Sequence, residues 1–294
     1  MEQKKNIDLT TFKLDDFFST QEDRDEDKKE KVEIIDLSLI DDFPEHPFKV
    51  QENEDLSKLK ESIKDNGVLE PIIVRKKENN RYEIIAGHRR KFASELLGNN
   101  FIPCIVRDMT KEEAIVYMVD SNLHRTNILP SEKAKAYKMK MNALKAQGKR
   151  NDLTSSPLAT KLDTATLVGK EQGESRDQVY RYIKLNDLIP ELLDMVDNSV
   201  LNEKPAIALR PAVEISYLSK DEQEMLFNSI EYSDATPSHA QAIKLRKESE
   251  LNGLTEEFIE NLMSEEKPNQ ITKIKISENK IKSVMPKNLS LIHI

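Results

Sequence analysis

The segment "IIAGHRRKFASELLG", residues 84–98, joins a strand-like run to a helix-like run, with Gly87 at the junction. The first turn of a helix has backbone N–H groups without intrahelical partners and carries the positive end of the helix dipole. Arg89 and Arg90 fall in that turn and could donate charge-assisted hydrogen bonds to phosphate oxygens. Gly87 permits unusual backbone angles and the close approach of a ligand. The segment predicts a phosphate site, although a solvated basic helix start would have the same sequence.

A second segment, "TATLVGKEQGESRDQVYRYIKLNDLIPELL", has the spacing of a helix-turn-helix. In that geometry Gly169 would let two helices approach closely, and Gly173 would take the left-handed turn conformation. Val179 and Ile183 would pack the second helix inward. A plain helical hairpin has the same periodicity, so this segment alone leaves both interpretations open.

The outward-facing side chains of the second helix would suit base edges and phosphates in a major groove. These side chains are Ser175, Arg176, Gln178, Arg181 and Lys184. Ser175 is also expected to cap the second helix, and Asp163 the first. Residues 145–184 hold eight Lys or Arg against five acids, a local excess that permits DNA binding despite the net charge of −8.

The elements that would position these residues change character near Thr110. Before it, "KVEIIDLSLI", "EPIIVRKK", "RYEIIAG" and "FIPCIVRDM" are strand-like, with the middle two forming a hairpin. Helices are expected over "DLSKLKESIKDNG", with Gly67 as its cap, and over residues 88–97. After Thr110 helices follow at 111–125, from Pro130 to Gly148, and onward to about residue 265, with a loop over 149–163. The fold class is therefore α+β, a small mixed-sheet domain followed by an all-helical region.

Composition limits the class of protein. The 294 residues suffice for about two domains, and 33% of them are charged. The single cysteine, Cys104, excludes an internal disulfide and is expected in a buried strand. No apolar run is long enough to span a membrane and no signal peptide is recognisable, so we expect a cytoplasmic protein without membrane contact. Residues 1–31, with ten acids against seven bases, are expected to form a disordered acidic tail.

Four boxes in order, "HPFKV", "GVLEPIIV", "AGHRR" and "SNLHRTNILPSEKA", followed by the helix-turn-helix, resemble the ParB family of DNA-partition proteins over about residues 32–250. The resemblance implies a homodimer that binds a short palindromic, centromere-like site in double-stranded DNA. It also implies binding of CTP with Mg²⁺, closure into a clamp that slides along DNA, and a ParA-type ATPase partner. The replicon would be a chromosome, a plasmid or an integrated mobile element, with the protein associated with the nucleoid or plasmid.

The resemblance also assigns roles to residues. The nucleotide-binding set is Gly87, His88, Arg89, Arg90, Asn122, His124, Arg125, Phe48 and Pro71. Two family carboxylates are replaced here, the Glu of the GERR box by His88 and the Glu of the ENxxR segment by Ser121. Carboxylates there would help to hold Mg²⁺ and to assist attack on the γ-phosphate. Asp120 is a weak substitute metal ligand, and we expect nucleotide binding more than hydrolysis, leaving a weak CTPase activity open.

The predicted domains are residues 1–31 as the tail, 32–125 as the nucleotide-binding domain, 126–232 as the DNA-binding domain, and 233–294 as a helical C-terminal segment that could support dimerisation. Two other functions remain open. One is a helix-turn-helix transcription regulator without clamp activity. The other is an enzyme of the same N-terminal fold, either a nucleotide-dependent small-molecule kinase or a sulfiredoxin, although "AGHRR" lacks the cysteine that a sulfiredoxin needs.

Overall fold

The computed structural model describes residues 31–48, 52–125, 128–151 and 164–265. The chain divides into two compact units, residues 1–183 and 184–294, and each is described by itself. The domain boundaries expected after residues 125 and 232 remain predictions. The expected acidic tail, the Asp163 cap and the end of the C-terminal segment lie outside the described residues.

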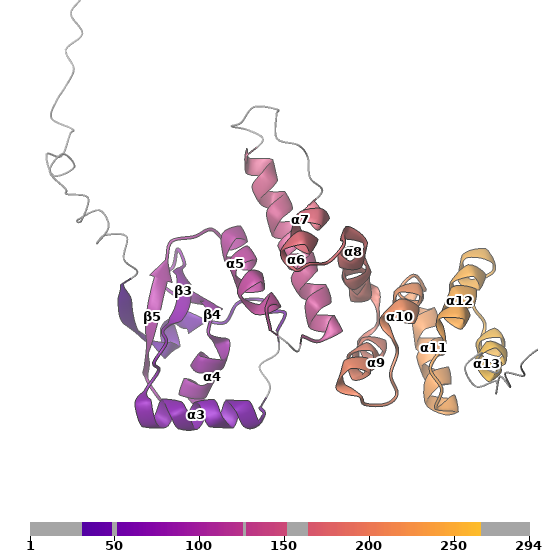
Figure 1. The fold of residues 1–294 in the computed structure, drawn as a ribbon, viewed down its shortest axis with the longest axis horizontal. Helices are drawn as coiled ribbons and strands as arrows, with labels where there is room; N and C mark the ends of the chain where they lie inside the picture. Colours follow the sequence, from indigo (N-terminus) through magenta and orange to yellow (C-terminus); the bar gives the residue numbers. More distant parts are fainter. Residues whose placement is uncertain (1–30, 49–51, 126–127, 152–163, 266–294) are drawn as a thin grey trace, which may run out of the picture. The chain divides into compact units, whose positions relative to one another are not determined.

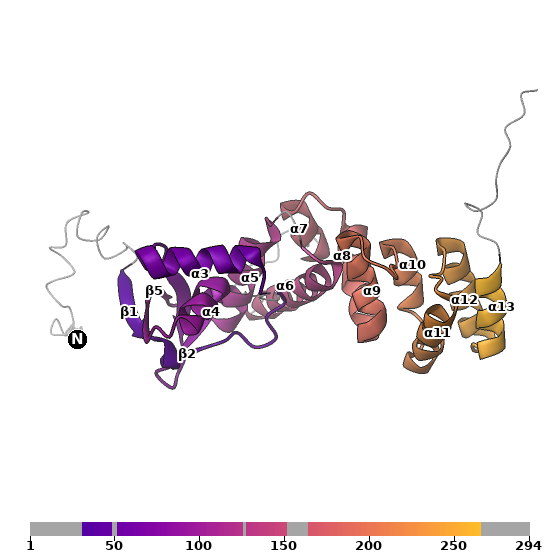
Figure 2. The same cartoon turned by 90° about the horizontal axis from the view of Figure 1, so that it is seen from below.

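A mixed sheet forms the N-terminal part of the first unit (Figures 1 and 2). Its strands are β1 (Val32–Asp36), β2 (Ile40–Asp41), β3 (Ile72–Lys76), β4 (Tyr82–Ala86) and β5 (Phe101–Arg107), in the spatial order β1-β5-β3-β4-β2. The expected hairpin is confirmed, because β3 and β4 pair antiparallel. β5 pairs parallel with β3 and antiparallel with β1, and β2 pairs parallel with β4. With the helices that follow, this confirms the predicted α+β class.

Helices α3 (Glu54–Asn66) and α4 (His88–Leu96) pack against each other through a small cluster that includes Leu56, Ile63 and Ala93. Gly67 follows α3 with φ of +72°, as the sequence predicted. Partly buried Val68 joins this cluster to the buried face of the sheet. The two helices thereby fix the junction at Gly87 between β4 and α4.

Helices α5 (Lys111–Leu123) and α6 (Pro130–Asn151) follow the sheet. Thr110 caps α5 through a reciprocal capping box with Glu113. The prediction that α6 ends at Gly148 was wrong, because its backbone remains helical to Asn151. A glycine inside a helix costs only about 1 kcal/mol relative to alanine and does not by itself end the helix. Of the loop expected over 149–163, the first three residues are therefore helical, and the rest lies outside the described residues.

One hydrophobic core joins the sheet to the helices α5, α6, α7 (Thr164–Glu171) and α8 (Arg176–Lys184). Its buried members are Phe43, Phe48, Ile85, Ala114, Met118, Val119, Leu123, Ala136, Tyr137, Met141, Ala165, Val168 and Val179. We call this set the central core. It runs from the segment after β2 to the helix expected to read DNA.

The second unit is helical, as predicted for residues up to 265. Its helices are α9 (Pro190–Leu201), α10 (Leu209–Ile215), α11 (Lys220–Ser233), α12 (His239–Leu251) and α13 (Glu256–Ser264), preceded by a 3₁₀ turn at Leu185–Asp187. Fully buried Gln223 ties this turn to α11, because its side chain accepts the N–H of Ile189 at 2.8 Å and donates to the carbonyl of Asp187 at 3.1 Å. A buried amide with partners on both sides fixes the start of α9.

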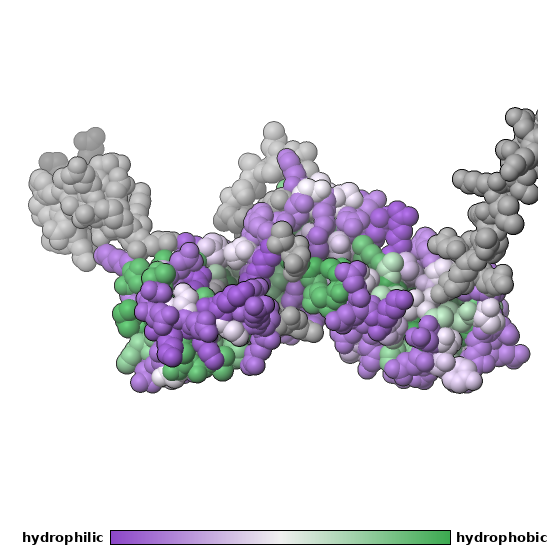
Figure 3. Space-filling view, turned by 60° about the horizontal axis from the view of Figure 1, so that its bottom comes forward, coloured by the Kyte–Doolittle hydropathy of each residue, from purple (hydrophilic) through white to green (hydrophobic). Residues whose placement is uncertain are grey.

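Cys104 is fully buried in β5, as expected, where burial raises the pKa of its thiol to about 12. The outer faces of β1 and β5 are apolar and exposed, with Val32, Ile34 and Phe101 more than half accessible. Figure 3 shows this hydrophobic surface at the end of the unit that carries the two strands. Among the described residues, no helix combines the length and the hydropathy needed to cross a membrane.

Candidate functional site

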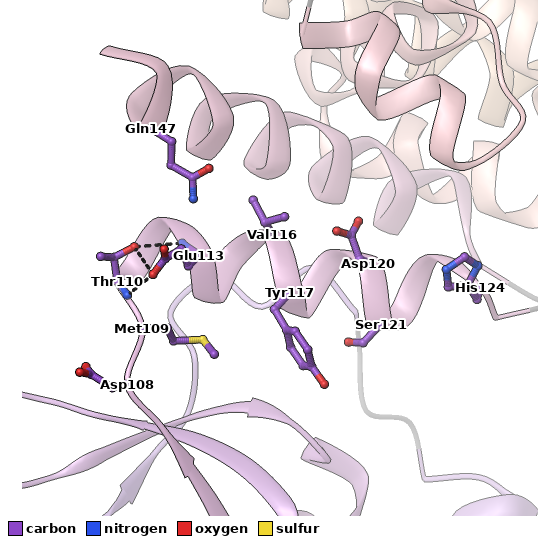
Figure 4. Close-up of a pocket in the computed structure, with 10 residues that line it drawn as sticks. All are labelled: Asp108, Met109, Thr110, Glu113, Val116, Tyr117, Asp120, Ser121, His124 and Gln147. Atoms are coloured by element: carbon purple, nitrogen blue, oxygen red, sulfur yellow. Dashed lines mark hydrogen bonds between the residues drawn. The ribbon is translucent and has the colours of Figure 1, made fainter. Parts of the chain in front are cut away.

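Two cavities adjoin helix α5, and their linings differ in charge. The larger, of about 940 Å³, lies between the segment before α5, helix α5 itself and Gln147 of α6 (Figure 4). Its described lining contains Asp108, Glu113 and Asp120 but no Lys or Arg. Such a lining repels phosphate. The smaller cavity, of about 500 Å³, is lined by three arginines, Arg89, Arg90 and Arg125, against two acids, Asp55 and Glu70. We call it the arginine cavity, and its excess of positive charge suits an anion.

Three residues of the predicted site lie at or beside the larger cavity. In Figure 4, Asp120 points from α5 toward α6, where its carboxylate pairs with the almost fully buried Lys140. His124 lines the larger cavity and not the smaller one. Ser121 lines both cavities, and its hydroxyl donates to the carbonyl of Met118 at 3.0 Å.

The smaller cavity opens at the N-terminus of α4, where Gly87 is the cap residue with φ of +99°. No side chain caps this helix, and its first turn has no acidic residue. A Cβ at Gly87 would also lie 2.7 Å from Cγ2 of Ile72. Glycine is therefore required by both backbone angle and packing, and the uncapped helix start presents backbone N–H groups and a positive dipole.

The three arginines of this cavity differ in their partners. Arg90 is held by the loop before β3, because it donates to the carbonyls of Glu70 at 2.5 Å and Pro71 at 3.0 Å. Among the described residues, Arg89 has only a long contact, 3.4 Å from Nη2 to the amide oxygen of Asn53. Although Arg125 reaches solvent, partial desolvation and then the positive charge of Arg89 lower its pKa. Two like charges that disfavour each other in one cavity are stabilised when an anion binds between them.

Asn122 and Phe48 contribute less directly than the family assignment implies. Asn122 lines the cavity but is buried, and its amide donates to the Met118 carbonyl at 2.7 Å. Phe48 belongs to the central core, where its ring centre lies 5.8 Å from the Arg125 guanidinium. The Phe48 ring therefore packs beside the Arg125 guanidinium, and the Pro71 carbonyl accepts a hydrogen bond from Arg90.

His88 stacks on His46, with ring centres 3.7 Å apart. His46 Nδ1 lies 2.6 Å from the Phe48 carbonyl, which requires the proton on Nδ1 and leaves Nε2 as an acceptor. Both Nε2 atoms are buried without a hydrogen-bond partner among the described residues. Burial, followed by the charges of His46, Lys91 and Arg125, lowers the pKa of His88 to about 3, and burial lowers that of His46. The pair is neutral at physiological pH, and its close stacking was not predicted.

Helices α7 and α8 are joined by a short turn, as both a helix-turn-helix and a plain helical hairpin require. Gly173 has φ of +68°, and Val179 is fully buried. A Cβ at Gly169 would lie 2.6 Å from the carbonyl oxygen of Glu174, so only glycine lets the helix and turn meet. Ser175 accepts the N–H of Gln178 at 3.2 Å and caps α8 as predicted. Ile183 packs, partly buried, against the central core.

The outward set on α8 divides into accessible and engaged residues. Arg181 and Arg176 are exposed, with the Arg176 guanidinium 5.4 Å from the Tyr180 ring centre, and Gln178 is half-buried. Lys184 pairs with Asp187 at 2.7 Å and lies over the ring of Tyr217. The spacing of three between Lys184 and Asp187 could have predicted that pair.

Sequence reasoning missed the residue that fixes the turn, Glu174. Its carboxylate pairs with Lys133 and accepts the hydroxyl of Tyr137 at 2.9 Å, both on α6. The Tyr137 and Tyr182 rings meet edge to face at 6.0 Å. We call Glu174, Lys133, Tyr137 and Tyr182 the turn anchor. No local sequence pattern predicts the turn anchor, because Glu174 and its partners on α6 are about 40 residues apart in the sequence.

Comparison with known proteins identifies the N-terminal domain. Residues 21–123 match the model of the ParB N-terminal domain. The chain therefore contains a ParB N-terminal domain. It is 31% identical over 182 residues to Stage 0 sporulation protein J of Bacillus subtilis, covering 62% of this chain and 57% of that protein. It is 35% identical over 164 residues to the probable chromosome-partitioning protein ParB of Borreliella burgdorferi, covering 55% and 56%.

A solved ParB structure is also similar. The C-terminally truncated chromosome-partitioning protein ParB from Caulobacter crescentus, complexed with CTP-γ-S, is 22% identical with a TM-score of 0.31, covering 68% of this chain and 98% of that one. The chain spans less than two thirds of the length of the two curated relatives named above. What those proteins do as a whole is a proposal for this chain.

Proposed function

We propose that this protein is a sequence-specific DNA-binding partition protein that a nucleoside triphosphate, CTP by family resemblance, switches between states on DNA. The observation that carries the proposal is the central core. It contains both Phe48, beside the arginine cavity, and Val179 of α8, the proposed DNA-reading helix, within one compact unit. Arg125 lies over Phe48 of that core. A ligand that displaces Arg125 would therefore shift side chains that are packed, through the core, against α8. Ligands shift such equilibria through contacts that differ between states.

In this proposal the triphosphate lies at the uncapped start of α4. Backbone N–H groups of that turn and the guanidinium groups of Arg89 and Arg125 would bind its oxygens. Gly87 keeps the turn open, and Arg90 braces it against the loop before β3. A bound anion would offset the repulsion between Arg89 and Arg125. Binding would therefore draw the start of α4 toward the end of α5.

DNA would be read by α8. Arg176, Gln178 and Arg181 are the accessible side chains suited to base edges and phosphates, while Ser175 both caps the helix and faces the groove. Reading a palindrome requires two copies of α8, so the functional form would be a homodimer. The protein would then be found on the nucleoid or on a plasmid. A ParA-type ATPase partner would be detected as a change in its ATPase rate on mixing.

Hydrolysis of the nucleotide is not part of the proposal. The two positions at which the family has carboxylates carry a neutral, half-buried imidazole and a hydroxyl already bonded to its own helix. Neither can take a proton from an attacking water at neutral pH and keep it. We expect the nucleotide to act as a switch by its presence.

The experiment begins with selection of a binding site from random duplexes, followed by titration of the selected site with and without CTP. CTP is expected to alter DNA binding, and Arg125→Ala is expected to abolish the CTP response while leaving nucleotide-free DNA binding intact. Lys76→Ala, an exposed cation of the same unit outside the cavity, is the matched control. Spreading of the protein on closed DNA would separate a clamp from a simple regulator. Binding of CTP by Arg125→Ala at unchanged affinity would refute the assigned site.

A further inference from the structure

The two positions at which the family has metal-binding carboxylates do not supply one here. His88 and Ser121 both line the arginine cavity. The Ser121 hydroxyl donates to the Met118 carbonyl, and the His88 ring stacks on His46. Mg²⁺ is a hard cation that prefers oxygen ligands in octahedral geometry and is usually held by one or two carboxylates together with phosphates. These two residues do not fit it.

Two other carboxylates, Asp55 and Glu70, line the same cavity but stand at neither of the two family positions, and Asp120 and Glu132 are not part of its lining. Glu70 pairs with Arg90 at 3.3 Å, and Asp120 pairs with Lys140 at the other cavity. Glu132 accepts the N–H of Leu129 at 3.2 Å and is not part of the cavity lining. Asp55 lies in the first turn of α3, where the helix dipole favours its charge.

Clusters of metal-binding side chains are absent from the described residues as well. Within the described ranges, no group of three or more His, Cys, Asp or Glu residues could hold a metal ion. The two short gaps that flank the cavity in sequence, residues 49–51 and 126–127, read Lys-Val-Gln and Thr-Asn and contain no carboxylate. These two segments of the sequence therefore supply no further carboxylate.

Positive charge is supplied by the protein instead. Arg89 and Arg125 line one cavity of about 500 Å³ at a helix N-terminus without an acidic residue in its first turn, and Arg90 braces that turn against the loop before β3. Guanidinium groups form bidentate bonds to phosphate and are always charged, so they can neutralise a triphosphate without a cation. The stacked imidazoles beside them are nitrogen ligands, which Mg²⁺ does not favour.

We infer that this chain binds its nucleoside triphosphate without requiring a divalent cation. The inference rests on the proposed function and departs from the Mg²⁺ that the family resemblance implies. The arginines and the start of α4 neutralise the triphosphate charge in place of a cation. At His88 and Ser121 the chain lacks the carboxylates through which it would select the Mg²⁺-bound nucleotide.

Isothermal titration of the full chain with CTP, in excess Mg²⁺ and in excess EDTA, tests the inference. The two dissociation constants are expected to agree within about twofold, whereas loss of a required cation would weaken binding by about tenfold or more, the factor that 1.4 kcal/mol represents. Weaker binding in EDTA by that factor overturns the inference but leaves the proposed function standing. No binding in either buffer overturns the proposed function itself.

A second variant places a carboxylate at the Ser121 position of the cavity. Ser121 is exposed, so Ser121→Glu is expected to fold, which circular dichroism checks, and Ser121→Gln is the neutral control of equal size. The glutamate variant is expected to bind CTP at least about tenfold more weakly in EDTA than in Mg²⁺, because its charge opposes the triphosphate until a cation bridges them. The glutamine variant is expected to show no such difference. A glutamate variant that binds equally well in both buffers would place Ser121 away from the phosphates and overturn the inference.

Discussion

Replacement of Gly87 by alanine should damage the start of α4 in two separable ways. The residue has φ of +99°, which costs an alanine about 1–2 kcal/mol. The added methyl would also lie 2.7 Å from Cγ2 of fully buried Ile72 and 3.3 Å from its Cα, so packed atoms must shift. Overpacking of this kind costs about 1–3 kcal/mol. The free energy of unfolding should therefore fall by about 2–5 kcal/mol, with loss of nucleotide binding.

Gly98, which follows the other end of α4, provides the matched control. It also has positive φ, +72°, but a Cβ there meets nothing within 4 Å. Gly98→Ala should lose only the backbone term, so urea unfolding followed by circular dichroism should separate the variants by about 1–3 kcal/mol. Adding Ile72→Leu, which removes the branch at Cβ, should recover part of the Gly87→Ala loss. Equal destabilisation by the two alanines would refute the packing argument.

Three further predictions concern charge. Because the folded-state pKa of His88, about 3, lies below the ordinary histidine pKa of about 6.5, the free energy of unfolding should fall as pH decreases from 6.5 to 3, by up to about 1.4 kcal/mol per pH unit; His88→Gln should flatten the profile in urea titrations at several pH values. Arg181→Ala should weaken binding of the selected DNA site by about 1–3 kcal/mol in fluorescence anisotropy, and unchanged affinity would remove α8 as the reader. Glu174→Gln should lower the melting temperature more than Tyr137→Phe, because it also strands the Lys133 charge, whereas the phenylalanine loses one hydrogen bond worth about 1 kcal/mol.

The parts of the fold that the sequence predicted are those determined by neighbouring residues. Gly67 and Gly173 were identified because each must take a left-handed conformation, and Gly169 because two helices meet there. The Ser175 cap likewise depends on a contact three residues away. The end of α6 was predicted wrongly at Gly148, because a glycine costs a helix only about 1 kcal/mol relative to alanine and does not by itself end it.

The parts that escaped prediction depend on residues distant in sequence. The spacing around "AGHRR" predicted a cationic helix start, but nothing local placed His46 against the ring of His88. Asp120 was considered as a metal ligand because it neighbours Ser121, yet helix geometry turns adjacent side chains about 100° apart, and Asp120 faces Lys140 instead. Side-chain direction, rather than residue type, separates the two cavities.

The turn anchor has a mechanical consequence. Lys133 and Tyr137 lie three and seven residues after Pro130, so the turn between α7 and α8 is attached within about 11 Å of the start of α6, at 1.5 Å per residue. A rotation of that first stretch of α6 would therefore carry α8 with it. The turns of α6 after Tyr137 lie beyond these two contacts. Lengthening or softening of those later turns should leave the proposed coupling between the arginine cavity and α8 unchanged, while a break between Pro130 and Tyr137 should remove it.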